Sequence, residues 1–252
     1  VVRRVVAVAI VLALSTSGVG GGPRSQDKSP LRILRILFIG NSLTAANNLP
    51  GIVEALDRAR GGATVKTTAV TASNFSLEDH WNQGQARAAI ATGRWAVVVL
   101  QQGPSALPES RVLLRDYTKR FAAEARKAGA RTALYMVWPS QARARDFDDV
   151  SESYALAARD VDGLLLPAGD AWREAWRLDP SLALYDSDGF HPSGLGSYLA
   201  ALAVWRGLSR ESVVGLPGPP GVSASTLRQL QESADRAVTV SASPSKEFAA
   251  LR

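Results

Sequence analysis

Two short polar segments, far apart in the chain, carry the residue types that nucleophilic catalysis needs. Gly40-Asn41-Ser42 follows an apolar run, and Asp188 precedes His191 by three positions in a glycine- and proline-containing loop. A serine hydroxyl is a weak nucleophile until an imidazole removes its proton, and a carboxylate fixes that imidazole in the required tautomer. Either segment alone has an ordinary structural explanation, because Gly-Asn-Ser is common in turns. Together they predict a triad of Ser42, His191 and Asp188.

The composition argues against several other chemistries. The 252 residues include no cysteine, which removes disulfides, thiolate nucleophiles and thiolate metal sites. Only two histidines, His80 and His191, are present, and we expect no metal and no organic cofactor. The formal charge of +6 includes three arginines in an N-terminal stretch that has no acid. The remaining arginines lie among acidic residues, so we expect no nucleic-acid partner.

The N-terminal segment has the pattern of an export signal. Arg3 and Arg4 precede an apolar run over residues 5–14, which small residues follow. This run is shorter than the ~20 residues of a membrane span. We therefore expect a signal peptide over residues 1–22 and a flexible leader over 23–30, in a secreted or extracytoplasmic protein. A first strand or buried helix is the alternative, and the membrane is a partner only if the signal segment stays uncleaved.

Apolar, β-branched runs alternate with helical patterns through the rest of the chain, which predicts a three-layer α/β/α sandwich. Continuous apolar strands separated by helices indicate a parallel sheet that is covered on both faces. The predicted strands are residues 33–39, 64–70, 95–100, 131–137 and 163–166. The predicted helices are residues 49–60, 109–128, 151–160, 171–177 and 193–206.

A segment rich in proline and glycine, residues 215–221, separates these elements from a last amphipathic helix, residues 223–238. We expect this helix to pack back on the sandwich. The sequence therefore predicts a single domain over residues 31–252, and we expect a monomer.

On this strand pattern the two polar segments resemble the first and last sequence blocks of the SGNH, or GDSL-type, hydrolases. Residues 40–44 are similar to the Gly-Asp-Ser-Leu-Thr block, with Asn41 in place of the usual aspartate, and residues 188–192 are similar to Asp-x-x-His-Pro. The resemblance covers residues 31–208. It implies a flavodoxin-like sandwich with a parallel five-stranded sheet. It also implies Ser42 as nucleophile, His191 as general base and Asp188 as the residue that orients the base.

The middle blocks match less well, and they bear on the oxyanion hole. Where the family has a glycine whose amide binds the oxyanion, Asn74 is the best substitute, because asparagine tolerates left-handed backbone geometry. Where the family has Gly-x-Asn, this chain has Gln101-Gln102-Gly103. The predicted oxyanion donors are therefore the amides of Ser42 and Asn74 and the side chain of Gln102. Gln101 is predicted as a substrate contact, and it is the second choice for the side-chain donor.

Other polar and aromatic residues allow two interpretations each. Trp81 and Trp138 are predicted substrate contacts, although core packing is the safer interpretation for a single tryptophan. His80 either lines the pocket or closes a loop as a structural histidine, and we favour the structural role. Three acidic residues at a helix start could bind calcium, but they also suit the helix dipole: Asp146, Asp148 and Asp149.

These features predict an exported serine esterase that acts on small acyl esters, with O-acetyl groups on carbohydrate as one candidate substrate. Two alternatives stay open. One is an extracellular glycan-binding module that keeps the triad but lacks a working oxyanion hole. The other is an acyltransferase that moves acetyl groups between sugars.

Overall fold

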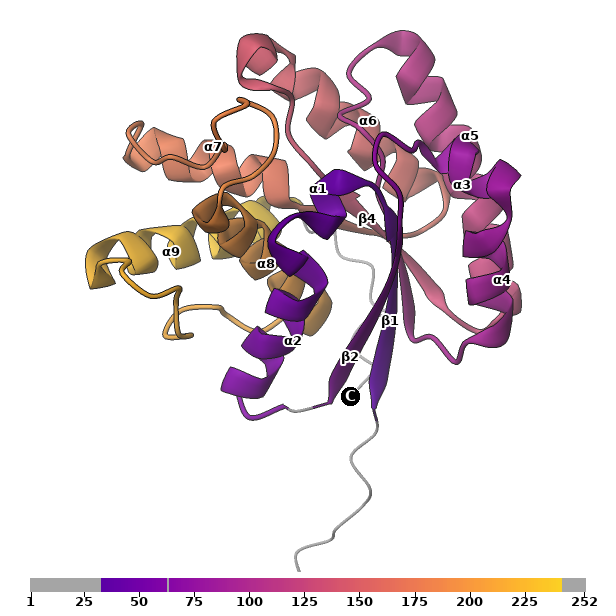
Figure 1. Cartoon of the computed structure of the whole chain (residues 1–252), viewed down its shortest axis with the longest axis horizontal. Coiled ribbons are helices and arrows are strands. Elements are labelled where there is room, and N and C mark those ends of the chain that lie inside the picture. Colours follow the sequence, from indigo (N-terminus) through magenta and orange to yellow (C-terminus); the bar gives the residue numbers. More distant parts are fainter. Residues whose placement is uncertain (1–32, 63, 242–252) are drawn as a thin grey trace, which may run out of the picture. The chain divides into compact units, whose positions relative to one another are not determined.

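The computed structural model describes residues 33–62 and 64–241 (Figure 1). The predicted signal peptide and leader lie outside the described residues. Five strands form one all-parallel sheet in the order β2-β1-β3-β4-β5. The strands are β1 (Leu34–Gly40), β2 (Val65–Thr71), β3 (Val97–Leu100), β4 (Arg131–Met136) and β5 (Leu164–Pro167). The predicted α/β fold is confirmed, and this strand order is the flavodoxin-like one.

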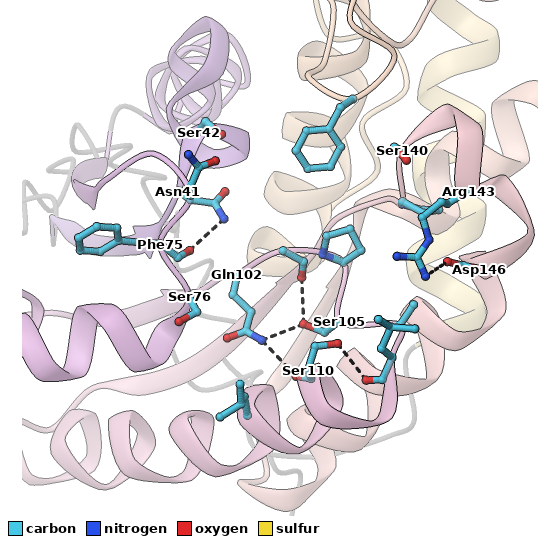
Figure 2. Close-up of a pocket in the computed structure, with 18 residues that line it drawn as sticks. Asn41, Ser42, Phe75, Ser76, Gln102, Ser105, Ser110, Ser140, Arg143 and Asp146 are labelled. Carbon is cyan, nitrogen blue, oxygen red and sulfur yellow. Dashed lines mark hydrogen bonds and ion pairs between the residues drawn. The ribbon is translucent and has the colours of Figure 1, made fainter.

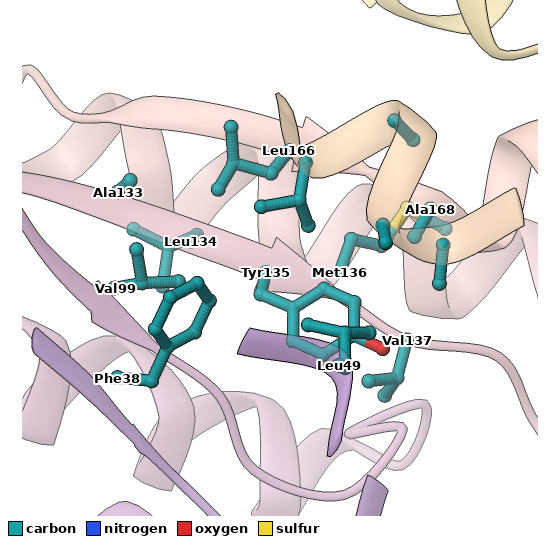
Figure 3. Packing of buried hydrophobic residues seen from close by; sticks show 14 of the residues in the cluster. Phe38, Leu49, Val99, Ala133, Leu134, Tyr135, Met136, Val137, Leu166 and Ala168 are labelled. Atoms are coloured by element: carbon teal, nitrogen blue, oxygen red, sulfur yellow. The ribbon is translucent and has the colours of Figure 1, made fainter. Parts of the chain in front are cut away.

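The middle strands are apolar throughout because helices cover both faces of the sheet. All four residues of β3 are buried, and so are the last five residues of β1 and of β4. Figure 3 shows how Phe38, Val99 and Leu134 from these three strands pack together in the core. The edge strand β2 is largely exposed by comparison.

Two layers of helices enclose the sheet. One layer contains α3 (Leu77–Gln83), α4 (Gln85–Thr92), α5 (Pro108–Lys127) and α6 (Phe147–Asp160), while α2 (Leu49–Ala59) and α8 (Gly194–Ser209) pack together in the other (Figure 1). Helices α7 (Ala168–Leu178) and α9 (Ala224–Ser241) pack on each other and on α8. The short helices are α1 (Ser42–Ala45), η1 (Ala46–Asn48) and η2 (Gln141–Asp146).

Gly196 shows why α8 packs so closely. A Cβ atom at this position would lie 2.1 Å from the carbonyl oxygen of Leu184 and 2.6 Å from the ring of Trp172. Close packing therefore requires the second glycine of the Gly194-Leu195-Gly196 sequence, whereas a Cβ atom at Gly194 would meet no atom within 4 Å. Among the described residues, no helix combines the length and the apolar character that crossing a membrane requires.

The strand predictions agree with the structure to within two residues, but the two helices between β2 and β3 were missed, as were the short helices α1, η1 and η2. Helices α3 and α4 make the crossover between β2 and β3, where the sequence analysis proposed no helix. Gly84, with a φ of +83°, separates them into two short pieces with weak periodicity. The available signal was the Ser76–Asp79 capping box, which is formed in the structure.

Candidate active site

The candidate nucleophile lies directly beyond the carboxyl end of β1, where the strand order reverses between β1 and β3. Ligands of open parallel sheets bind at this position. Gly40 is required here because a Cβ atom would lie 2.4 Å from both Gln101 Oε1 and Thr44 Oγ1. Asn41 caps the next helix, its Oδ1 accepting from Leu43 N at 3.1 Å, so that Ser42 becomes the first residue of α1.

The structure brings Ser42, His191 and Asp188 together although 149 positions separate the serine from the histidine. His191 Nε2 lies 2.9 Å from Ser42 Oγ, and His191 Nδ1 lies 2.5 Å from Asp188 Oδ2. Because a carboxylate only accepts, Nδ1 carries the proton and Nε2 is free to accept the serine proton. The three side chains thus have the connectivity that activates a serine.

The carboxylate of Asp188 is held by three donors. Its second oxygen, Oδ1, accepts from the backbone N–H groups of Phe190 and His191, both at 2.9 Å. The hydrogen bond from the His191 side chain, reinforced by these two amides, lowers the pKa of Asp188 to about 2. Asp188 is therefore ionised wherever the imidazole works as a base.

Asn47 joins the two halves of this arrangement, and the sequence analysis missed it. Its Nδ2 donates to Pro192 O at 3.0 Å and to Ser197 Oγ at 2.9 Å, which links the segment after the serine to the segment after the histidine. Asn47 has a φ of +52°, a geometry that asparagine adopts more readily than most residues. The signal was the Asn-Asn pair before Leu49, which is typical of a turn.

The two backbone amides that the sequence predicts as oxyanion donors belong to residues that line the same cavity. No acceptor among the described residues is hydrogen-bonded to the amide of Ser42, which opens a helix, and the same holds for the amide of Asn74. Asn74 has the left-handed geometry expected of it, with a φ of +63°. Asn41 Nδ2 donates to Phe75 O at 3.1 Å and so ties the Asn74 turn to the nucleophile turn.

The side chain of Gln102 is not a free donor, which corrects its predicted role in the oxyanion hole. Its Nε2 donates to Ser105 Oγ at 2.8 Å and to Ser110 O at 3.3 Å, and its Oε1 accepts from Leu77 N at 3.1 Å. Both amide hydrogens are already used. Gln102 instead fixes the loop after β3 to α3 and α5.

Gln101 is also not a substrate contact, because it is 1% exposed and fully bonded within the protein. Its Oε1 accepts from Asn41 N at 2.9 Å and from Thr44 Oγ1 at 2.7 Å, and its Nε2 donates to Asn41 Oδ1 at 2.9 Å. Gln101 therefore holds the nucleophile turn in place from the neighbouring strand.

Neither predicted tryptophan lines the candidate cavity. Trp81 lies on α3, and its ring meets the ring of Phe121 of α5 edge-on, with 5.2 Å between the ring centroids. The guanidinium group of Arg87 lies over the Trp81 ring. Trp138 is fully buried and stacks on Trp172 at 3.6 Å. Both predictions are wrong for the same reason: these rings fill space between helices and the sheet.

His80 has the structural role that the sequence analysis favoured. It is 1% exposed, and its Nε2 lies 2.7 Å from Gly40 O, so Nε2 is the donor. Burial lowers its pKa, against the effect of the Gly40 hydrogen bond. His80 thus stabilises the last residue of β1 in its neutral form.

The acidic residues considered for calcium point to different arginines. Asp146 pairs with Arg143, Asp148 with Arg173 at 2.8 Å, and Asp149 with Arg111 at 3.5 Å. Among the described residues no cluster of three or more metal-ligating side chains occurs. The carboxylates are therefore not gathered for a metal ion.

A cavity of about 480 Å³ opens beside Ser42 (Figure 2). Its walls are mostly apolar, with a few polar groups. In Figure 2 Ser42, Asn41 and Phe75 lie on one side of the cavity, and Arg143 and Asp146 lie on the other. A substrate in this cavity can therefore contact the candidate nucleophile at one end and a charged pair at the other.

Several solved structures share this fold, and the names of most of them are those of SGNH hydrolases, GDSL-like lipases or esterases. A Slackia heliotrinireducens protein provisionally assigned to the SGNH hydrolases is 29% identical, with a TM-score of 0.59 over 70% of this chain and 100% of that one. A DUF4886 family protein from Bacteroides uniformis is 18% identical, with a TM-score of 0.69 over 82% and 95%. An acetyl xylan esterase is 13% identical, with a TM-score of 0.52 over 68% and 98%. The two likenesses below 25% identity show a shared fold, which is also the fold of the protein assigned to the SGNH hydrolases.

No protein-family model and no curated protein sequence matches the chain. Its similarity to known proteins is therefore carried by the fold.

Proposed function

We propose that this chain, whose fold is that of the SGNH/GDSL hydrolases, is an exported serine esterase that hydrolyses small acyl esters. The observation that carries the proposal is the continuous hydrogen-bonded chain from Ser42 Oγ through His191 to Asp188. Export rests on the signal pattern of residues 1–22.

In the acylation step Ser42 Oγ attacks the ester carbonyl carbon while His191 Nε2 removes the hydroxyl proton. The imidazolium that forms is stabilised by the ionised Asp188. Collapse of the tetrahedral intermediate breaks the bond to the alcohol oxygen, and His191 returns the proton to that oxygen. The acyl group is then an ester of Ser42.

In the deacylation step water replaces the alcohol. His191 removes a proton from the water, the resulting oxygen bonds to the acyl carbon, and the Ser42 ester bond breaks. The proton returns from His191 to Ser42 Oγ, and the carboxylic acid is released. All proton transfers use one base.

The negative oxygen of both tetrahedral intermediates requires donors that are already oriented. The amides of Ser42 and Asn74 supply two, since neither is hydrogen-bonded to a described residue. Donors of this kind contribute about 3–4 kcal/mol each to transition-state stabilisation in serine enzymes. Because Gln102 donates both amide hydrogens to Ser105 and Ser110, the oxyanion has two backbone donors and no donor from Gln102.

The acyl group is small in this proposal, and O-acetyl groups on carbohydrate are candidate substrates. The cavity beside Ser42 combines apolar walls with polar groups at its far end, which suits a short acyl group on a polar alcohol. The neighbour named an acetyl xylan esterase has the same fold.

Replacement of the nucleophile tests the proposal. Ser42→Ala should lower kcat on p-nitrophenyl acetate by at least roughly 10⁴-fold and abolish covalent labelling by a fluorophosphonate. The protein should remain folded, because Ser42 Oγ bonds only His191 among the described residues. Ser181→Ala, in an exposed turn, is the matched control and should keep full activity.

The result also separates the alternatives. Labelling of the wild-type protein without turnover would favour transfer to an acceptor sugar, and the absence of labelling would favour a binding module. Unchanged turnover by Ser42→Ala would refute the proposed nucleophile.

A further inference from the structure

Arg143 and Asp146 are the only ionisable residues that line the cavity in the described part of the chain. Arg143 lies in η2, is about half exposed, and forms an ion pair with the largely buried Asp146. The esterase chemistry proposed above uses neither residue, although both face the space that a substrate would fill (Figure 2).

The two residues lie on the side of the cavity where the alcohol half of an ester must bind. His191 protonates the departing alcohol oxygen, so that half of the substrate lies toward the His191 loop. The loop after β4 packs on the His191 loop through three hydrogen bonds: Trp138 Nε1 to Phe190 O at 3.0 Å, Gln141 N to Gly189 O at 2.8 Å, and Tyr185 Oη to Pro139 O at 2.6 Å. Arg143 and Asp146 follow directly in this loop.

Both members of the pair have hydrogen-bonding capacity left. Arg143 uses one nitrogen, Nη2, on Asp146 Oδ2, and its other guanidinium N–H groups have no hydrogen-bond partner among residues 33–62 and 64–241. The second oxygen, Asp146 Oδ1, accepts no hydrogen bond from the described residues and has Arg145 Nε at 3.7 Å. A donor set and an acceptor therefore stand side by side at the end of the cavity.

The charge of the pair selects the chemistry of its ligand. A carboxylate or phosphate would accept from Arg143 but would meet the charge of Asp146, and an ammonium group would meet the reverse conflict. A hydroxyl both donates and accepts, so one hydroxyl, or two on neighbouring carbons, satisfies both residues without a net charge. Phe190 and Pro139 add apolar surface beside the pair, as in sites where a few polar groups orient a ligand.

We propose that Arg143 and Asp146 form a subsite that recognises hydroxyl groups on the alcohol half of the ester, so that the enzyme selects neutral polyol or sugar esters. This inference rests on the proposed esterase function and assigns specificity to two residues outside the triad. The acyl half then lies on the Asn74 and Phe75 side.

Two acetate esters with the same acyl group and ring size test the subsite. Methyl 6-O-acetyl-glucopyranoside carries ring hydroxyls, and cyclohexylmethyl acetate carries none. The ratio of their kcat/KM values should fall on the order of 10- to 100-fold in Arg143→Met and in Asp146→Asn, because hydrogen bonds to a charged partner are lost for only one ester. Arg126→Met, in the last turn of α5, is the matched control: that exposed side chain forms no ion pair with the described residues and does not line the cavity, so the ratio should stay within about twofold.

Folding is checked separately by thermal melting, and Arg143→Lys provides a second variant that keeps the positive charge but loses the planar N–H set. It should lower the ratio less than Arg143→Met does. Unchanged ratios in folded variants would overturn the subsite while leaving the esterase function intact. A third ester, 4-(acetoxymethyl)cyclohexane carboxylate, overturns the neutral-ligand assignment if it is the best substrate and loses most in Arg143→Met. A wild-type protein that cleaves none of these esters would overturn the esterase function and the subsite together.

Discussion

Asn41 shows how one side chain links the turn that carries Ser42 to the turn that carries Asn74. Its Oδ1 caps α1 and accepts from Gln101, while its Nδ2 donates to the carbonyl oxygen of Phe75. The Phe75 carbonyl follows Asn74, so this bond fixes the peptide turn that presents the Asn74 amide. The sequence block that this segment resembles usually has an aspartate at this position. An aspartate could cap the helix but could not donate to the carbonyl oxygen of Phe75.

Asn41→Asp should therefore lower kcat/KM on p-nitrophenyl acetate by about tenfold or more, because the new carboxylate oxygen faces a carbonyl oxygen. KM should change little, since the effect falls on the oxyanion. Steady-state kinetics measures both parameters. Asn48→Asp makes the same chemical change at an exposed helix cap whose oxygen accepts from Gly51 N, and its activity should be unaffected. Equal activity of the two variants would contradict the role assigned to Asn41.

At the scale of elements, the His191 loop depends on the segment that follows β4. Trp138 contributes a hydrogen bond to Phe190 O, between the triad acid and base, and its ring is locked by stacking on Trp172. Trp138, which the sequence analysis predicted as a substrate contact, thus holds the His191 loop in place through the carbonyl oxygen of Phe190.

Trp138→Phe keeps an aromatic ring in the stack but leaves the Phe190 carbonyl without its donor. We expect a loss of about 1–3 kcal/mol in the free energy of unfolding and a fall of about tenfold in kcat, with KM nearly unchanged. Denaturant titration and steady-state kinetics measure the two effects. Trp95→Phe is the matched control: it loses an equivalent bond, to Ala89 O at 2.8 Å, but lies before β3 at the other end of the sheet. It should lose stability without losing kcat, and a parallel loss of kcat would contradict a specific role for Trp138.

The sequence predicted the strands and the polar segments at their ends because these depend on local patterns. Apolar runs gave the parallel sheet, and strand ends gave the positions of Ser42 and of the loop that carries His191. Side-chain direction was harder to predict. Gln102 follows a strand as an oxyanion donor would, but Ser105 and Ser110 take its amide hydrogens, and these partners come from the fold of the next loop.

Trp81 failed for a related reason. Without α3 in the prediction, residue 81 belonged to a loop near the site, whereas in the structure it lies on a helix and packs on α5. Arg143 carried no motif at all, because its position in the cavity depends on the packing of the η2 segment near the His191 loop.

At the scale of the whole molecule, the core and the site share the end of β1. His80, from the layer that contains α5 and α6, donates to Gly40 O. Gln101, which follows the neighbouring strand β3, accepts from the backbone N–H of Asn41, the residue after Gly40. Protonation of His80 would keep the Nε2 bond to Gly40 but would bury a charge and a second N–H group, at Nδ1, that has no hydrogen-bond partner among the described residues.

The pH dependence of stability tests this coupling. The folded-state pKa of His80 lies below the value of about 6.5 for the unfolded chain, so the unfolded state binds the proton first on acidification. The stability that neutral His80 contributes is thus complete above pH 6.5 and is lost as pH falls from there toward the folded-state pKa. The loss is about 1.4 kcal/mol for each pH unit by which folding lowers the pKa. Denaturant titrations between pH 7.5 and pH 5 should show a steeper fall in the wild-type protein than in His80→Gln, whose amide can donate to Gly40 but does not titrate. The two proteins differ only at residue 80, and identical slopes would show that His80 does not couple pH to folding.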